Sequence, residues 1–376
     1  MIVVNDFWTV KGVPQWMKHA DTNVDFLGLA DVVFPVFLFV VGMSIPFAIE
    51  RRYSKGFSEL STVGHILSRT LALIIMGIFT VNTEYGISRD VGMKMHVFKT
   101  LMVVAFFMVW NVYPKTDKPI RLLYTVLQIL GFLGLIYLAF IFRDSKGGYM
   151  QARWWGILGI IGWTYLVSAF IYLFVRDKIL RIALIWLAFI GLSLLKSSQL
   201  IPREANILNN LLGILNIGNA SSLALTMGGV LFSLVVTKYA NVVTWKKIAF
   251  FVSTVAVLLI AAKISNEFWI ISKNRGTPTW VIYCLAISVG LYGLLAWVVS
   301  AGKEKWFNII KPAGTATLTC YIVPYLLYSV FWGFLSFSLP VWMKTDAMGL
   351  VKCLGFAFLC VLVTWLLGRI NIKLKV

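Results

Sequence analysis

Charged side chains are scarce in this chain of 376 residues: Asp, Glu, Lys and Arg make up 13% of it, whereas hydrophobic residues make up 60%. Soluble globular domains carry about 25% charged residues. The few polar side chains left here cannot cover a surface that faces water on all sides. The composition therefore excludes a soluble globule and predicts an integral membrane protein.

Acidic residues are scarcer than basic ones: the chain has 15 Asp and Glu, 34 Lys and Arg, and a net charge of +19. Such a balance can suggest nucleic acid, but the basic residues are scattered in twos and threes through nearly every loop. Nucleic-acid binding instead needs a basic stripe on one face. The pattern favours the anionic headgroups of a lipid bilayer as the partner, and no nucleic acid.

Cysteine is rare as well, and Cys284, Cys320, Cys353 and Cys360 all lie in apolar runs without C-x-x-C spacing. Neither a metal site nor a disulfide framework is expected, and the cysteines are interpreted as small packing residues. The sequence also lacks a G-x-x-x-x-G-K-[ST] loop, which excludes a phosphate-cradling ATPase site of that kind. Without a repeat, a low-complexity tract or a soluble domain, residues 1–376 are expected to form a single membrane domain.

Long hydrophobic runs are what the chain has in abundance. A bilayer core requires about 20 mostly apolar residues per helix, and the strands of an outer-membrane barrel, which alternate over about 10 residues, do not fit these runs. The expected spans are 29–49, 64–82, 97–113, 120–142, 154–175, 179–195, 219–238, 248–264, 278–299, 313–336 and 348–368. The sequence thus predicts an all-α, polytopic membrane bundle of about eleven transmembrane helices. Residues 1–4 resemble the last turn of a further, truncated apolar helix.

Basic residues indicate an orientation for these spans. The connections after the first, third, fifth, seventh and ninth spans, and the C-terminal tail, carry about three Lys or Arg each. The positive-inside rule places them in the cytoplasm. The opposite connections include the longest ones, around 83–96, 196–218 and 265–277, and long loops tend to carry function. We therefore expect a protein of the inner (cytoplasmic) membrane with His19 on the non-cytoplasmic side.

The stretch before the first span gathers polar residues that are rare elsewhere: Asn5, Asp6, His19, Asp25 and Asp31. A lone histidine is usually an ordinary loop residue, but here nearby carboxylates can orient the ring or raise its pKa. Asp31 is either a helix N-terminal carboxylate favoured by the macrodipole or a functional group at the membrane boundary.

Other polar positions each carry two interpretations. Pro35, in the first turns of its span, predicts a bend or break that can line a cavity. Arg69 either snorkels to the headgroups or binds a phosphate. Amides such as Asn206 and Asn274 suit sugar hydroxyls, or are loop residues. Trp16 belongs to an interfacial belt or stacks on a sugar ring.

These stretches together resemble the transmembrane acetyltransferase family typified by lysosomal heparan-α-glucosaminide N-acetyltransferase and its bacterial relatives. The resemblance runs through residues 4–5, 18–20, 29–35, 39–45, 69–71, 77–78 and 81–82, more weakly through 206–229, and again at 272–274 with Trp280. It covers most of the chain in order.

The resemblance implies a reaction. The family moves the acetyl group of cytosolic acetyl-CoA across the membrane onto the amine of a terminal glucosamine, and its catalytic histidine matches His19. The matching Asn5 and Asp31 are expected in the same cavity, Asp31 as the orienter of His19 and Asn5 as a donor to the thioester carbonyl. The imidazole either takes the proton of the attacking amine or itself accepts the acetyl group, and both routes stay open.

The remaining candidate residues follow from the same comparison. Arg69, with Arg51 or Arg52, is expected to hold the phosphates of CoA. The expected substrate-binding residues are Asp6, Trp16, Asn82, Asn206 and Asn274. Compared with the family, we expect the first helix and the Asp-Ala-Leu-Arg-Gly lead-in to be missing, and Pro324 stands where human-type members have a histidine.

Two other functions are alternatives to acetyl transfer. One is an amino-sugar permease without bond-making chemistry, with a binding site formed by a broken helix at Pro35 and the amide-rich loops. The other is a carrier that places a different acyl group on a surface polysaccharide. The expected partners are an amino sugar or glycan terminus and the lipid bilayer, with a homodimer left open.

Overall fold

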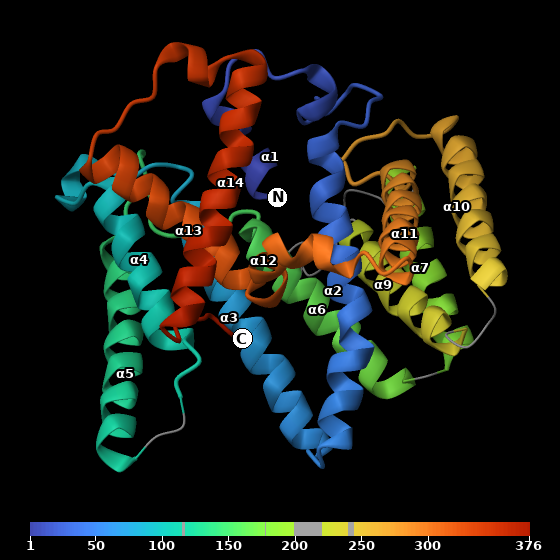
Figure 1. Cartoon of the computed structure of the whole chain (residues 1–376), viewed down its shortest axis with the longest axis horizontal. Helices are drawn as coiled ribbons and strands as arrows, with labels where there is room; N and C mark the ends of the chain where they lie inside the picture. Colours follow the sequence, from blue (N-terminus) through green and yellow to red (C-terminus); the bar gives the residue numbers. More distant parts are fainter. Residues whose placement is uncertain (115–116, 177, 199–219, 240–243) are drawn as a thin grey trace. The chain divides into compact units, whose positions relative to one another are not determined.

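The computed structural model describes residues 1–114, 117–176, 178–198, 220–239 and 244–376, and within them the chain is built of helices (Figure 1). The long helices are α2 (Leu29–Ser54), α3 (Glu59–Asn82), α4 (Met95–Trp110), α5 (Lys118–Ile141), α6 (Gly156–Val175), α7 (Ile179–Ser197), α9 (Ser221–Lys238), α10 (Thr244–Asn266), α11 (Pro278–Ser300), α13 (Thr317–Tyr328) and α14 (Asp346–Arg369). No strand occurs in these ranges. The prediction of an all-α polytopic membrane bundle is confirmed.

The shorter elements connect these helices. They are α1 (Ile2–Asn5), η1 (Phe7–Thr9), η2 (Gln15–Met17), η3 (Arg89–Val91), η4 (Glu304–Ile309), α12 (Lys311–Thr315), η5 (Ser329–Phe334) and η6 (Val341–Lys344). Each of the eleven expected spans corresponds to helix in the described residues. Ten segments there are long and apolar enough to cross a membrane, whereas α4, with 16 residues, is shorter.

The tenth expected span, 313–336, is not one regular helix. Its chain passes through α12, α13 and the π-helical turn η5, and the change occurs around Ala316, whose φ of −131° lies outside the helical region. Several helices, by contrast, continue beyond the expected apolar run. In α2, for example, residues 50–54 continue the backbone hydrogen bonding of the helix.

The chain divides into two compact units. The first unit comprises residues 1–13, 72–159 and 304–376, and the second comprises residues 14–71 and 160–303. In the first unit α4 packs against α5, and α13 packs against α4 and α14. In the second unit α2 packs mainly against α9, α9 against α7, and α10 against α11 (Figure 1).

Of the bend or break expected at Pro35, helix α2 contradicts the break. It runs without interruption from Leu29 to Ser54, with both Pro35 and Pro46 inside it. Proline removes one backbone hydrogen bond, the one to the carbonyl four residues earlier, which for Pro35 is the carbonyl of Asp31. That oxygen accepts a hydrogen bond from the indole Nε1–H of Trp280 at 3.0 Å. Because the freed acceptor is satisfied from α11, the helix continues.

Candidate active site

His19 and Asp31 meet in the second unit. His19 lies in the loop after η2, and Asp31 lies in the first turn of α2. The imidazole Nδ1 is 2.7 Å from Asp31 Oδ1, and the backbone N–H of Ala20 donates to Asp31 Oδ2 at 2.8 Å. The carboxylate therefore holds both the ring and the backbone next to it.

The two side chains differ in exposure in a way that matters chemically. Asp31 is 3% exposed, whereas His19 is 55% exposed. An ionised Asp31 accepts a hydrogen bond from Nδ1–H of the neutral ring, and the lone pair of that tautomer is then on Nε2. The pair thus presents a basic, oriented ring nitrogen on an exposed side chain.

Gly28 lets the loop fold back on itself. A Cβ atom at this position would lie 1.9 Å from the carbonyl oxygen of Lys18 and 3.4 Å from Asp31 Oδ2. Only glycine allows so close a backbone approach. This turn brings His19 to a carboxylate twelve residues further along the chain.

The loop between α10 and α11 packs on the His19 loop. Its contacts are Asn266 Nδ2 to Asp25 Oδ2 (3.0 Å), Ile271 N to Asp25 Oδ1 (2.7 Å), Ser272 Oγ to Thr22 O (2.9 Å), Asn274 Nδ2 to Thr22 Oγ1 (3.0 Å), and Arg275 to Asn23. Asp25, expected beside the ring, instead anchors this loop. Asn274, an expected substrate-binding residue, uses an amide N–H for the same purpose.

Lys273 is a member of the site that sequence reasoning did not single out. Its Nζ lies 3.3 Å from His19 Nδ1. Burial lowers the pKa of Lys273, while the nearby Asp31 carboxylate opposes that effect. The only sequence signal was its position inside residues 272–274, one of the segments that carry the family resemblance.

The three arginines expected to bind CoA lie on α2 and α3 within the second unit. Arg51 is exposed. The Arg52 guanidinium donates to the carbonyl and hydroxyl oxygens of Ser61, both at 3.1 Å. Arg69 lies over the ring of Tyr165, 4.6 Å from its centroid. Arg52 is thus held against the start of α3. Its partner there, Ser61, lies about two helical turns before Arg69 on the same helix.

Asp6, an expected substrate-binding residue in the first unit, is fully buried. Tyr328 donates its hydroxyl to Asp6 Oδ1 at 2.8 Å, and Lys352 Nζ lies 2.6 Å from Oδ2. Lys352 also contacts Thr9. Asn5, by contrast, is exposed at the end of α1. The carboxylate of Asp6 is therefore occupied by protein groups, while the amide of Asn5 is accessible.

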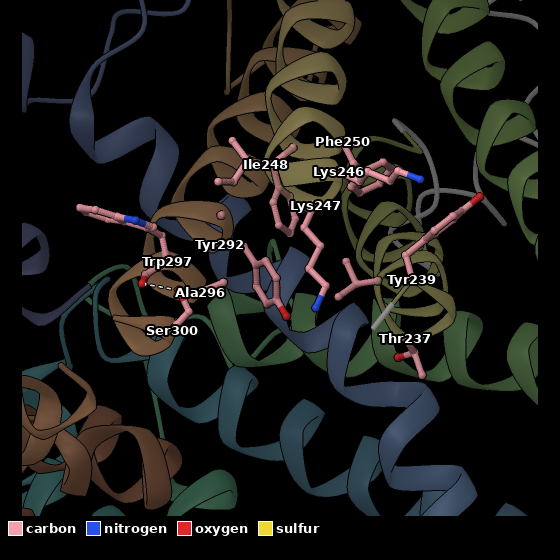
Figure 2. A pocket seen from close by; sticks show the side chains of 13 residues that line it. Thr237, Tyr239, Lys246, Lys247, Ile248, Phe250, Tyr292, Ala296, Trp297 and Ser300 are labelled. Carbon is pink, nitrogen blue, oxygen red and sulfur yellow. Dashed lines mark hydrogen bonds between the residues drawn. The ribbon is translucent and has the colours of Figure 1, made fainter. Parts of the chain in front are cut away.

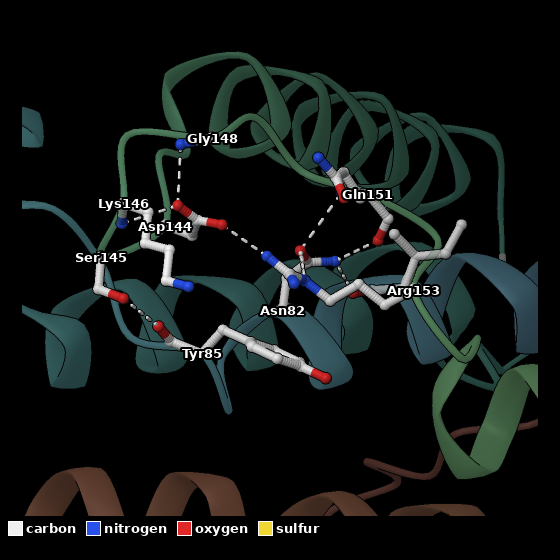
Figure 3. A network of polar contacts seen from close by, with 9 residues as sticks. Asn82, Tyr85, Asp144, Ser145, Lys146, Gly148, Gln151 and Arg153 are labelled. Atoms are coloured by element: carbon white, nitrogen blue, oxygen red, sulfur yellow. Dashed lines mark hydrogen bonds and ion pairs between the residues drawn. The ribbon is translucent and has the colours of Figure 1, made fainter.

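Asn82, also in the first unit, joins the end of α3 to the loop 142–155 (Figure 3). Its amide donates to the carbonyl oxygens of Ile78 and Gln151, both at 2.7 Å, and its oxygen accepts from Arg153 Nε at 3.2 Å. Arg153 in turn pairs with Asp144 at 2.6 Å. Asn82 is fully buried, so in this structure it serves the frame of the unit.

Two expected residues remain. Trp16, in η2, is 59% exposed and leaves its ring available for stacking. Asn206 lies outside the described residues. The site residues that the structure brings together are accordingly His19 and Asp31, joined by Lys273.

A comparison with known sequence families places the chain. The profile described as "Domain of unknown function (DUF5009)" matches residues 6–211, which include His19 and Asp31. The chain belongs to this family.

Two curated relatives extend the comparison. Heparan-alpha-glucosaminide N-acetyltransferase of Mus musculus is 32% identical over 125 residues, a stretch that covers 31% of this chain and 19% of the mouse protein. The Homo sapiens protein of the same name is 39% identical over 70 residues, covering 19% of this chain and 10% of the human one. The chain thus matches about a fifth or less of the length of these relatives, which are named as N-acetyltransferases.

Proposed function

We propose that this DUF5009 protein is a membrane-embedded acetyltransferase that moves acetyl from cytosolic acetyl-CoA to the amine of a glucosamine-type sugar or glycan on the non-cytoplasmic side. The observation that carries the proposal is the His19–Asp31 pair, in which a buried carboxylate 2.7 Å from Nδ1 orients an exposed imidazole. The names of the mouse and human relatives support the same class of reaction.

In the direct route His19 acts as the general base. The amine nitrogen attacks the thioester carbonyl while Nε2 takes the amine proton; the new C–N bond forms, the C–S bond breaks, and the imidazolium returns its proton to the departing thiolate. Asp31 holds the tautomer and stabilises the imidazolium. The amine and the imidazole must both be neutral at the start of this step. The hydrogen bond from Nδ1–H to Asp31 leaves the lone pair on Nε2, where it can take the amine proton.

A second route uses the same nitrogen as nucleophile. His19 Nε2 attacks the thioester, the C–S bond breaks, and the thiolate leaves and takes up a proton from solvent. The acetylated imidazole carries the group until the sugar amine displaces the ring; the C–N bond to the sugar forms, the bond to Nε2 breaks, and the amine proton is released through the freed ring to solvent. Both routes need the Asp31 contact, because it exposes the lone pair on Nε2. They differ in whether the protein carries acetyl when no acceptor is present.

The remaining roles are assigned by position and chemistry. Arg69, with the exposed Arg51, would hold the phosphates of CoA, and Arg52 would support them from its contacts with α3. Trp16, whose ring is exposed, would stack on the sugar.

The test is acetyl transfer in proteoliposomes with labelled acetyl-CoA and a panel of amino sugars. We expect acetylated product with the wild-type protein, and a loss of about 10²- to 10⁴-fold in rate for His19→Ala, the range for general acid–base catalysis. The control Val24→Ala changes a side chain of the same loop that is 43% exposed and has no assigned role, and it should leave the rate unchanged. Full activity of His19→Ala would show the assignment to be wrong.

Omitting the acceptor separates the two routes. Labelled acetyl on His19, found by peptide mass spectrometry, supports the relay; unlabelled protein that still acetylates the sugar supports direct transfer.

A further inference from the structure

A cavity lies in the second unit, at the ends of α9, α10 and α11 (Figure 2). Its volume is about 660 Å³. Its lining is formed by Val236, Thr237, Tyr239, Lys246, Lys247, Ile248, Phe250, Phe251, Tyr292, Gly293, Ala296, Trp297 and Ser300. None of the residues that we assign to acetyl transfer lines it.

The charge of this cavity is of one sign. Lys246 and Lys247 line it, and the lining contains no Asp or Glu. The sequence from 205 to 266 holds no acidic residue at all, and α11 holds none either. Among the described residues neither lysine forms an ion pair. Lys246 Nζ lies 5.6 Å from the centroid of the Trp245 ring, a contact that leaves its positive charge without a carboxylate partner.

Apart from the hydroxyl groups of Thr237, Tyr239, Tyr292 and Ser300, the rest of the lining is apolar or aromatic. It lies on helices that are long and apolar enough to cross a membrane. Helix α10 is largely uncovered by the rest of the protein: 11% of its most apolar stretch is buried. Ile248 is 50% exposed and Trp297 is 61% exposed. A ligand that fits must combine a negative group with apolar chains, as a phospholipid does.

Aromatic residues at the helix ends indicate how deep in the membrane the cavity lies. Tyr239 follows α9 directly, Trp245 stands in the first turn of α10, and Trp297 stands in the last turn of α11. Aromatic residues at helix ends mark the headgroup level of a bilayer. The lysines thus lie at the level of lipid phosphates, on the face that the positive-inside rule assigns to the cytoplasm, where anionic lipids are enriched.

We propose that this cavity binds an anionic glycerophospholipid, with Lys246 and Lys247 at its phosphate and the aromatic lining along its acyl chains. The hydroxyl of Tyr292 supplies a further polar group in the lining, whereas those of Thr237 and Ser300 donate to the backbone carbonyls of Ser233 and Trp297. The inference does not depend on acetyl transfer, because no residue is shared with the His19 site.

The experiment is native mass spectrometry of the purified full chain in detergent, with phosphatidylglycerol or phosphatidylcholine of identical acyl chains. We expect retained phosphatidylglycerol on the wild-type protein and little phosphatidylcholine. Each of Lys246→Ala and Lys247→Ala should lower phosphatidylglycerol retention about fivefold, since one basic residue near a lipid surface contributes about that factor. The control Lys55→Ala removes an exposed lysine outside the cavity and should leave retention unchanged.

Lys247→Arg guards against loss through misfolding, because it keeps the charge and should keep the lipid. Equal retention of the two lipids, or unchanged retention in the double alanine variant, would overturn the proposal. Displacement of phosphatidylglycerol by coenzyme A would also overturn it, since the cavity would then belong to a soluble phosphate compound.

Discussion

At the scale of single residues, the hydrogen bond from Trp280 to the carbonyl of Asp31 links two features that lie far apart in the chain. It supplies a donor to an oxygen that Pro35 leaves without its helical partner. The same residue, Asp31, orients His19 through its side chain. A proline that looks like a helix breaker in the sequence is therefore tolerated at the base of the candidate site.

Trp280→Phe tests this link. The change removes the Nε1–H and leaves the buried carbonyl with only the weak donor Cys284 Sγ at 3.9 Å, so the free energy of unfolding should fall by about 1–3 kcal/mol, measured by denaturant titration in detergent. In the background Pro35→Ala, where the backbone N–H is restored, the same change should cost clearly less. Equal costs in the two backgrounds would contradict the explanation.

The ion pair between Asp6 and Lys352 makes a second prediction at this scale. The Asp6 side chain is 1% exposed and that of Lys352 is 10% exposed. Lys352→Met leaves the carboxylate buried and unpaired, and it should lower the free energy of unfolding by about 3–5 kcal/mol. The double variant Asp6→Asn with Lys352→Met should recover part of this loss. A double variant as unstable as the single one would speak against a paired charge.

At the scale of elements, α2 and α9 pack through glycines. A Cβ atom on Gly42 would lie 1.8 Å from the carbonyl oxygen of Thr226, and one on Gly229 would lie 2.0 Å from that of Phe39. The two backbones thus approach more closely than any side chain allows, which is how membrane helices associate without a hydrophobic driving force.

Gly229→Val should force these helices apart and destabilise the protein by at least the 1–3 kcal/mol typical of overpacking. The control is Gly64→Ala on α3, where nothing lies within 4 Å of the added Cβ atom and helix propensity favours alanine. Thermal unfolding in detergent compares the two. A Gly229→Val protein as stable as the control would mean that the contact between α2 and α9 is looser than described.

The loop that packs on the end of α3 responds to pH through Asp144. Hydrogen bonds from the backbone N–H groups of Gly148 and Lys146 lower the pKa of Asp144, and Arg153 adds to the effect. A carboxyl whose pKa is lowered by folding stabilises the native state above its ordinary pKa of about 4 and loses that contribution as the pH falls through the lowered value. The wild type should therefore lose its advantage in unfolding temperature over Asp144→Asn on acidification from pH 6 to 3. A constant difference would contradict this.

At the scale of the whole molecule, the net charge of +19 and its distribution over the loops predict which side faces the cytoplasm. All four native cysteines are free and buried, so an added cysteine can be labelled against a low background. Val24, in the His19 loop, is 43% exposed, and Lys55, after α2, is exposed as well.

We expect a membrane-impermeant maleimide to label Val24→Cys in intact cells whose outer barrier is removed, and to label Lys55→Cys only after the membrane is opened. The opposite pattern would reverse the proposed orientation and place the candidate site on the cytoplasmic side.

The sequence by itself determined the helical membrane class, because the length and hydropathy of a span are local properties that the bilayer reads directly. It also singled out His19 and Asp31, which lie twelve residues apart. The sequence could not identify the long-range partners of these two residues. Lys273 contacts His19 across 254 positions, and Trp280 contacts Asp31 across 249.

Only the tertiary structure decided what the other polar residues do. Asp6 and Asn82 are chemically suited to bind a sugar, yet both are buried and bonded to protein groups far along the chain. Local pattern cannot distinguish such a residue from one that is free, because the difference depends on which donors and acceptors the packing brings within about 3 Å. The continuity of α2 through Pro35 was decided in the same way, by donors from α11: the indole N–H of Trp280 and, more weakly, Cys284 Sγ.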